Sequence, residues 1–459
     1  MNTEESGRLL FDRFIKPTID NQNNFIGVEI EMPIINLDKK PVNFETVHNI
    51  TEKFTEFFNF LPVGIDDDGN VYSAKSSANS DILSYDCSYN NLELSFGREE
   101  NLFEIQRRFE AYYRYLLKAF KPYNYTLTGM GVNPYRIYNK NEPIPNGRYR
   151  MLYRHLSSYP LYENLPMYFH SYPNFGMFSS ASQVQLDVNY NDLPRVINVF
   201  SELEPIKAVL FSNSVLTGEH EEYICCRDVF WENSTHGINP HNIGMYNQRF
   251  ENVEEIVNYL LTASIYCVER DGKYINFSPI LFSDYLKHEE TVGEYCENGR
   301  YVKTLVQPSA YDIEYLRTFK FEDITYRGTI EFRSVCCQPI SDCMVVAAFH
   351  LGIKNNLDRT EQILNNDKVL FGNGYTTAEL RKLLIKTEMP SFVDVDGLYR
   401  LAKDIVDVAF DGLKSRGRGE EALLSPLYER IDKRTNPART MLDLMNKGTP
   451  VEKIIEMYS

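Results

Sequence analysis

Residues 25–33 read FIGVEIEMP, and this stretch decides the fold that the sequence predicts. With the two-residue period of a β-strand, Glu29 and Glu31 share one face, and the aliphatic side chains between them share the other. The two carboxylates lie about 7 Å apart on such a strand, a spacing that suits two cations better than one. We expect the strand to end at Pro33, because proline cannot continue a ladder. Taken alone, the pattern also fits an ordinary strand with a solvated polar face.

Three later stretches repeat this combination of an apolar face with a face of carboxylates, amides or arginine. They are residues 91–96 with Glu93, residues 178–190 with Gln183 and Gln185, and residues 326–335 with Glu331 and Arg333. A solvated strand face is usually rich in lysine and threonine, whereas these faces are nearly free of lysine. We therefore interpret the four stretches as strands of one sheet whose polar faces converge.

Converging carboxylates repel one another, which raises their pKa values and destabilises the fold unless a divalent cation neutralises them. Oxygen ligands favour Mg²⁺ or Mn²⁺ over zinc. Arg333, two residues after Glu331, adds a fixed cation suited to phosphate or carboxylate. Since no Gly-x-x-x-x-Gly-Lys-Ser/Thr motif occurs, the pattern predicts a metal–nucleotide site built without a P-loop.

The overall composition narrows the class of partner. The chain has 459 residues and a formal net charge of −16, which argues against nucleic acid or an anionic membrane as the main partner. No signal peptide, no apolar run of transmembrane length and no Cys-x-x-Cys motif is visible, so we expect a reduced, cytoplasmic protein. His236 and His241 stand in a Gly/Asn/Pro loop without a third ligand, so we interpret them as loop residues and not as zinc ligands.

The organisation of the chain favours one domain over residues 1–459, because no internal repeat and no flexible linker is visible. Apolar stripes at helical spacing predict helices over residues 101–120 and 193–210. Helices dominate the C-terminal region, from about residue 340 to residue 459. The overall class is therefore α+β.

Seven short motifs follow one another along the chain. They are Gly27-Val28-Glu29-Ile30-Glu31, Glu93-Leu94-Ser95, Gly147-Arg148-Tyr149, Gln183-Val184-Gln185-Leu186-Asp187, Arg227 with Trp231, Lys273-Tyr274-Ile275, and Glu331-Phe332-Arg333. Their order resembles that in the glutamate–cysteine ligase (γ-glutamylcysteine synthetase) family, most closely the branch that includes the plant enzymes, over roughly residues 24–448. The resemblance implies a glutamine-synthetase-like fold, with a strongly curved, mainly antiparallel sheet forming a funnel and helices packed outside.

The resemblance also implies roles for individual side chains. The metal–ATP cluster would comprise Glu29, Glu31, Glu93, Gln183 and Glu331. Arg333 would hold phosphate, and the residues that take part directly in the reaction would be Glu331, Arg333 and Glu93. The amino-acid pockets would be lined by Arg148, Tyr149, Gln185, Arg227, Trp231 and Tyr274.

The implied reaction transfers the γ-phosphate of ATP to the side-chain carboxylate of L-glutamate, and the amine of L-cysteine then attacks the acyl phosphate. This is the first step of glutathione biosynthesis, with Mg²⁺ or Mn²⁺ as cofactor and ATP as co-substrate. We expect these small molecules as partners, with no nucleic acid and no membrane, and a monomer or homodimer. The residue types agree with this reaction, because metals and arginines can hold two anions together and stabilise the charge on the phosphoryl group during its transfer.

The sequence departs from the family pattern in two places. Relatives place an acidic residue shortly after the arginine, where this chain has Ser334-Val335-Cys336-Cys337-Gln338, and Gln185 stands where the plant-like enzymes have a shorter asparagine. Both departures concern the acceptor amine, so a ligase that joins glutamate to a different amine is one alternative. A non-catalytic barrel that binds a metal or ligand is another. The vicinal cysteines favour a core position over a redox switch.

Overall fold

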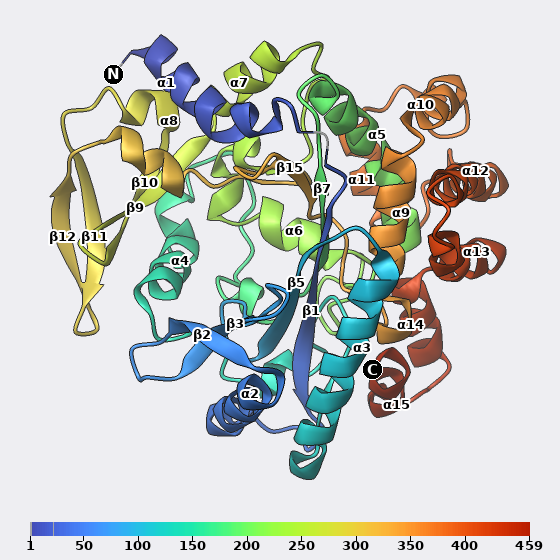
Figure 1. Ribbon diagram of the computed structural model, residues 1–459, viewed down its shortest axis with the longest axis horizontal. Helices are drawn as coiled ribbons and strands as arrows, with labels where there is room; N and C mark the ends of the chain where they lie inside the picture. Colours follow the sequence, from blue (N-terminus) through green and yellow to red (C-terminus); the bar gives the residue numbers. More distant parts are fainter. Residues whose placement is uncertain (1, 22) are drawn as a thin grey trace.

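The computed structural model describes residues 2–21 and 23–459 and centres on an open sheet of nine strands (Figure 1). The strands run in the order β14 (Glu322–Ile324), β15 (Thr329–Phe332), β7 (Ser182–Asp187), β1 (Ile26–Asn36), β5 (Asn91–Glu99), β4 (Ile82–Tyr85), β3 (Val71–Ser76) and β2 (Phe60–Ile65), with β6 (Tyr125–Leu127) paired to the end of β1. Every pairing described within this sheet is antiparallel. The expected α+β class with a large antiparallel sheet is confirmed.

Strand β1 is longer than the sequence predicted. It runs to Asn36, and Pro33 stays in register opposite Asn91 of β5. On the other edge of β1, pairing with β7 reaches only to Ile30, and pairing with β6 begins at Ile34. Because Pro33 lies between these two partners, its missing N–H interrupts no ladder. The predicted strand end at Pro33 is therefore wrong.

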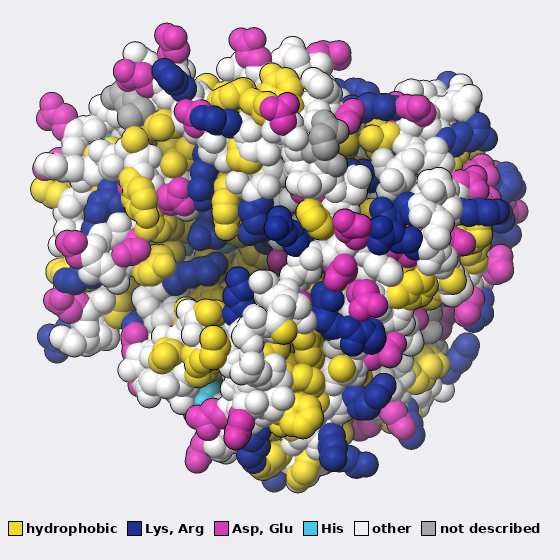
Figure 2. All heavy atoms as spheres, in the orientation of Figure 1, with side chains coloured by type: hydrophobic (Ala, Val, Ile, Leu, Met, Phe, Trp, Pro, Cys, Tyr) yellow, Lys and Arg dark blue, Asp and Glu magenta, His cyan; other side chains and the backbone are white. Residues whose placement is uncertain are grey.

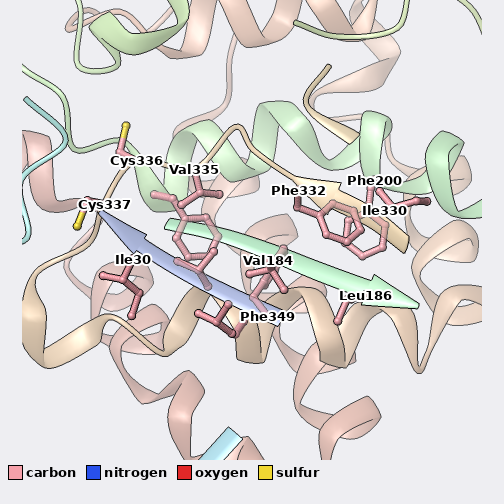
Figure 3. Packing of buried hydrophobic residues seen from close by; sticks show 14 of the residues in the cluster. Ile30, Val184, Leu186, Phe200, Ile330, Phe332, Val335, Cys336, Cys337 and Phe349 are labelled. Carbon is pink, nitrogen blue, oxygen red and sulfur yellow. The ribbon is translucent and has the colours of Figure 1, made fainter. Parts of the chain in front are cut away.

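One face of the sheet packs on helices α5 (Leu193–Phe211) and α9 (Val345–Lys354) (Figure 3). The buried side chains on this face are Ile30, Val184, Leu186, Ile330 and Phe332. Phe200 of α5 lies against Phe332, with 4.3 Å between the ring centroids. Burial of each such side chain stabilises the fold by about 1.5–3 kcal/mol. Because a shift by one residue would expose these side chains, their burial fixes the strand register, and the register determines which side chains point from the opposite face.

A second sheet of four strands lies on one side of the molecule (Figure 1), in the order β12 (Arg300–Val306), β11 (Thr291–Glu297), β10 (Lys273–Leu281) and β9 (Ser264–Arg270). Helix α4 (Gly147–Ser157) packs against β10 and β11. A short parallel pair, β8 (Ile243–Gly244) and β13 (Phe319–Lys320), links the two regions. These elements form the wall opposite the polar face of the large sheet.

The remaining helices surround the sheets. In the N-terminal half they are α1 (Thr3–Leu10), α2 (Phe44–Phe58), α3 (Leu102–Phe120), α6 (Cys226–Glu232), α7 (Val253–Leu261) and α8 (Phe282–Tyr285). After α9 they are α10 (Leu357–Asn366), α11 (Thr377–Leu384), α12 (Val395–Lys414), α13 (Ser425–Asp432), α14 (Pro437–Asn446) and α15 (Val451–Tyr458). One hydrophobic cluster extends from Leu10 to Ile431. Within the described residues no helix combines the length and the apolar character that crossing a membrane requires.

Local sequence explains where these helices begin. The side chain of Asn101 accepts a hydrogen bond from the backbone N–H of Phe103 at the start of α3. Asn436 does the same for Arg439 at the start of α14, where Pro437 occupies the first turn. Each cap satisfies a backbone donor that the helix itself leaves unpaired.

Candidate active site

The polar face of the large sheet opens into a cavity of about 530 Å³. In Figure 2 the molecular surface is hollowed at this place, and Lys and Arg side chains gather around the opening. Apart from Gln185, every site residue that the sequence predicted lines this cavity. The structure therefore brings together side chains that lie far apart in the chain, from Glu29 to Arg333.

Strand register explains why the acidic side chains converge. Glu31 on β1 stands opposite Glu93 on β5, and Glu29 stands opposite Gln183 on β7. On the next strand, Glu331 of β15 stands opposite Gln185 of β7. Residues directly opposite in antiparallel strands point to the same face, so all these side chains share one surface.

Gln185 joins the carboxylates of two strands. Its Nε2 donates to Oε1 of Glu29 at 2.9 Å and to Oε1 of Glu331 at 2.8 Å. Its Oε1 accepts from Nη2 of Arg327 at 2.7 Å, which fixes the orientation of the amide. The alternation of residues predicted that Gln185 shares the polar face with the carboxylates, which the structure confirms, and the amino-acid-pocket role implied by the resemblance stays a prediction.

Gln183 makes similar contacts with the neighbouring carboxylate. Its Nε2 donates to Oε1 of Glu31 at 2.9 Å, and the backbone N–H of Ala181 donates to Oε2 of Glu31 at 2.7 Å. The Oε1 atom of Gln183 is buried and has no hydrogen-bond partner. A buried acceptor without a donor is unfavourable and fits a site that completes its contacts with a ligand.

Burial and mutual repulsion perturb the carboxylates strongly. Burial raises the pKa of Glu29 well above its usual value, and the charges of Glu331 and Glu93 raise it further. Burial, with the charges of Asp86 and Glu93, raises the pKa of Glu31 to about 8. Burial and the charge of Asp86 raise the pKa of Glu93 to about 7. Such groups favour a compensating cation in their midst.

The donor set fits a hard divalent ion, although the side chains are not closed around one. In the region of the chain that the structure describes, no group of three His, Cys, Asp or Glu side chains is arranged to hold a metal ion. The amide proton of Gln185 lies between Glu29 and Glu331 instead. Carboxylate and amide oxygens are the ligand types that Mg²⁺ and Mn²⁺ prefer.

The three arginines that the sequence predicted reach the cavity from different elements. Nη1 of Arg333 donates to Oε2 of Glu331 at 2.5 Å, and although burial disfavours its charge, Glu331 and Asp323 raise the pKa of Arg333. Arg227 of α6 is 7% exposed, donates from Nη1 to the backbone carbonyl of Ser334 at 3.4 Å, and has no partner for Nε. The guanidinium of Arg148 lies over the ring of Tyr149.

The arginine cluster of helix α4 divides between the cavity and the surface. Arg150 pairs with Asp67 and Arg154 pairs with Glu294, both outside the cavity. Of these three arginines, Arg148 alone lines the cavity. The sequence left an anion site and a salt-bridged helix face as alternatives, and the same helix carries both a cavity-lining arginine and surface ion pairs.

Aromatic side chains also line the cavity. Trp231 stacks on Phe319, with 4.9 Å between the ring centroids, and meets Phe175 edge-on at 4.9 Å. Tyr274 of β10 lines the cavity close to the start of α4, where a Cβ on Gly147 would lie 3.2 Å from the Tyr274 ring. The glycine therefore allows β10 and α4 to approach each other.

Tyr149 lines the cavity, as predicted, with little of its side chain exposed. It is 7% exposed, and its hydroxyl donates to the backbone carbonyl of Tyr85 at 3.2 Å. Its polar group is thus directed to the backbone, and the side chain belongs to the hydrophobic core.

The cavity-lining residues that sequence reasoning missed include Asp86, Asp323 and His236. Asp86 lies seven residues before Glu93, outside any alternating stretch, and burial raises its pKa. Asp323 stands opposite Glu331 on the three-residue strand β14, and burial raises its pKa to about 7. His236, predicted to be a loop residue, lies in a 3₁₀ turn and is 4% exposed against aromatic rings.

The residues after Arg333 that differ from the family pattern lie outside the cavity. Val335, Cys336, Cys337 and Gln338 are all buried, and none of them lines the cavity. Figure 3 shows Cys336 and Cys337 pointing to opposite sides of the chain. Their side chains belong to the core, as the sequence favoured, although Sγ of Cys336 lies 3.6 Å from Sγ of Cys225.

The sequence also matches a known protein family. The model of a family described as glutamate-cysteine ligase family 2 (GCS2) matches residues 25–457, beginning at the first residue of the stretch that opens β1. The chain belongs to this family. The resemblance seen in the seven motifs is confirmed.

The relatives include plant enzymes. The chain is 27% identical to the chloroplastic glutamate–cysteine ligase of Nicotiana tabacum over 298 residues, which cover 61% of this chain and 52% of that protein. It is 23% identical to glutamate–cysteine ligase A of Oryza sativa subsp. indica over 436 residues, which cover 92% of this chain and 81% of that protein. The chain thus spans about half the length of the tobacco relative.

A similar fold occurs in the crystal structure of glutamate–cysteine ligase from Francisella tularensis in complex with AMP. The TM-score is 0.50, the sequence identity is 12%, and the alignment covers 96% of this chain and 88% of that chain. At this identity the likeness shows the fold alone.

Proposed function

We propose that this protein is an ATP-dependent ligase that joins the γ-carboxylate of L-glutamate to the amine of L-cysteine, the first step of glutathione biosynthesis. The observation that carries the proposal is the convergence of acidic strands β1, β5, β7 and β15 with Arg333, Arg148 and Arg227 in one cavity. Membership of the glutamate–cysteine ligase family and the AMP bound in the Francisella relative support it.

The chemistry requires two anions to meet. An oxygen of the glutamate γ-carboxylate attacks the γ-phosphorus of ATP, the bond to the β-phosphate oxygen breaks, and ADP leaves. The amine of cysteine then attacks the acyl carbon of the γ-glutamyl phosphate, the amide forms, phosphate leaves, and the amine gives up a proton. No protein nucleophile is needed, so the side chains act by positioning and by stabilising charge.

The carboxylate cluster would hold the divalent ion, which we propose to be Mg²⁺ or Mn²⁺. Its ligands would be drawn from Glu29, Glu31, Glu93, Gln183 and Glu331, together with ATP phosphate oxygens. The ion supplies neutralising charge between the triphosphate and the carboxylates. Arg333, held by Glu331, is placed to contact the transferred phosphoryl group.

The two other arginines suit the amino acids. Arg148 and Arg227 have no carboxylate within salt-bridge distance among the described residues, so each is free to bind a substrate carboxylate. Trp231 and Tyr274 line the same cavity and would enclose the aliphatic portions of the substrates.

The test is an assay of Mg²⁺-dependent ADP formation with L-glutamate and a panel of amines, with product mass determined in parallel. We expect ADP and γ-glutamylcysteine with L-cysteine. ADP formation with another amine but not with cysteine would instead identify a related carboxylate–amine ligase. No ADP formation with any amine would indicate a binding protein without catalytic activity.

The cytoplasmic location and the monomeric or homodimeric state stay predictions.

A further inference from the structure

The N-terminal segment precedes the region of the chain that the family model matches, yet it reaches the cavity. After α1, residues Phe11–Ile15 form a π-helical turn and Lys16–Thr18 form a 3₁₀ turn. Phe14, which belongs to the π-helical turn, lines the cavity, whereas the family match begins at residue 25. Single π-helical turns are rare and occur frequently at functional sites, because they re-aim individual side chains.

The turn between β14 and β15 faces this segment. Its residues Thr325, Tyr326 and Arg327 also line the cavity, and Tyr326 is 50% exposed. The guanidinium carbon of Arg13 lies 4.3 Å from the centroid of the Tyr326 ring, and that of Arg327 lies 5.0 Å from it. Two aromatic rings and the guanidinium of Arg327 thus line this part of the cavity, and Arg13 contacts the Tyr326 ring without lining the cavity itself.

Several contacts fix the segment against that turn. Nδ2 of Asn21 donates to the carbonyl of Gly328 in the turn at 3.1 Å, and Nη2 of Arg13 donates to Oε2 of Glu314, in the neighbouring 3₁₀ helix Ala310–Tyr315, at 2.5 Å. Gly328 has φ 77°, and a Cβ built there would lie 2.5 Å from the carbonyl oxygen of Pro17. Only glycine fits at this position, so the segment and the turn are closely packed.

This part of the cavity connects directly to the carboxylate cluster. Arg327 donates to Oε1 of Gln185 at 2.7 Å, and Nε2 of the same amide donates to Glu331 at 2.8 Å. A single side chain therefore separates this part of the cavity from the place where phosphates and the divalent ion would bind. A ligand whose polyphosphate occupied the cluster would project its base toward Phe14 and Tyr326.

We propose that the N-terminal segment completes the nucleotide subsite, with the purine base of ATP held between the cavity-lining rings of Phe14 and Tyr326. This inference rests on the proposed ATP-dependent function. Stacking on aromatic rings and on guanidinium planes accepts a purine face, and Arg327 stands beside the expected course of the phosphates.

The experiment compares the affinity of the full chain for ADP with its affinity for inorganic tripolyphosphate, both measured by titration calorimetry in Mg²⁺. Phe14→Ala and Tyr326→Leu should each weaken ADP binding by about fivefold to a hundredfold, the range expected for loss of one base-stacking contact. Binding of tripolyphosphate, which has no base, should stay unchanged. Phe57→Ala, which truncates a 67% exposed aromatic side chain outside the cavity, is the matched control.

Phe14→Leu keeps most of the apolar volume and loses the aromatic ring. It therefore tests whether stacking on Phe14 contributes to ADP affinity if Phe14→Ala does not fold. Unchanged ADP affinity in the folded variants, or equal losses for ADP and tripolyphosphate, would overturn this inference while the unaltered protein still forms ADP. An unaltered protein that neither binds ADP nor forms it would overturn the proposed function as well.

Discussion

The side-chain amide of Gln185 donates to the carboxylate of Glu331, with 2.8 Å between Nε2 and Oε1. The same nitrogen lies 2.9 Å from Oε1 of Glu29, so one amide group partly offsets the repulsion between the carboxylates of Glu29 and Glu331. An amide carries no net charge, and the cluster therefore stays short of positive charge without a bound ion.

Glu331→Gln should lower the rate of Mg²⁺-dependent ADP formation by at least about 100-fold, because it removes a charge from the proposed ion site and the partner of Arg333. The substitution keeps the shape of the side chain, so the thermal unfolding temperature should change little. Glu297→Gln, on the exposed end of β11, is the control. If Glu331→Gln formed ADP at the wild-type rate, Glu331 would not be a ligand of the divalent ion.

Stability in the absence of divalent ions should fall as pH rises from about 5 to 8. The pKa values of Glu31 and Glu93 are raised in the folded protein, from an ordinary value of 4.5 to about 8 and about 7. Between these values the folded state holds more protons than the unfolded state, so raising the pH favours unfolding. Mg²⁺ competes with those protons, and its stabilising effect should therefore grow with pH.

Urea unfolding at several pH values, with and without Mg²⁺, measures this dependence. Glu31→Gln should reduce the slope of stability against pH in the metal-free protein, because one of the titrating groups is removed. A free energy of unfolding that rises over this range would contradict the expected coupling.

Arg148→Lys should raise the KM for an amino-acid substrate by about tenfold or more and leave the KM for ATP nearly unchanged, because lysine cannot form a bidentate pair with a carboxylate. Arg150→Lys is a matched control on the same helix, since Arg150 pairs with Asp67 outside the cavity. Equal effects of the two substitutions on steady-state kinetics would argue for a structural role of Arg148.

Arg381→Leu should destabilise the protein by about 3–5 kcal/mol, because it leaves buried carboxylates without their partner. Arg381 donates to Glu204 and to Asp228, and all three side chains are buried. Burial alone would raise the pKa of Glu204, yet Lys207 and Arg381 lower it to about 2. Equilibrium unfolding in urea gives the difference in free energy.

Arg400→Leu provides the comparison for that loss, since its ion pair with Asp394 is exposed and should contribute less than about 1 kcal/mol. Similar losses for Arg381→Leu and Arg400→Leu would show that the buried network contributes no more than a surface pair.

The sequence could predict the acidic face because side-chain alternation is local. Once Glu29, Glu93 and Glu331 lie on strands with an apolar opposite face, packing of that face determines where they point. The order of the strands is not local, so the pairing of Gln185 with Glu331 could not be read from periodicity, which predicts only that both lie on polar faces.

The residues that sequence reasoning missed share a physical cause. Asp86 precedes a strand without belonging to an alternating pattern, and Asp323 lies on a strand of only three residues. His236 is buried against the ring of Phe319, which comes from a distant region of the chain, and against that of the nearby Trp231. Where tertiary contacts alone create an environment, local sequence carries no signal for it.

The order of strands also has a consequence for synthesis on the ribosome. Strand β7 pairs with β1 on one edge and with β15 on the other, and β15 follows it in sequence by more than a hundred residues. Until residues 329–332 emerge, a nascent chain holds β7 with one edge unpaired, and such edges invite association between chains. Products terminated before this point should therefore aggregate and lack a complete site.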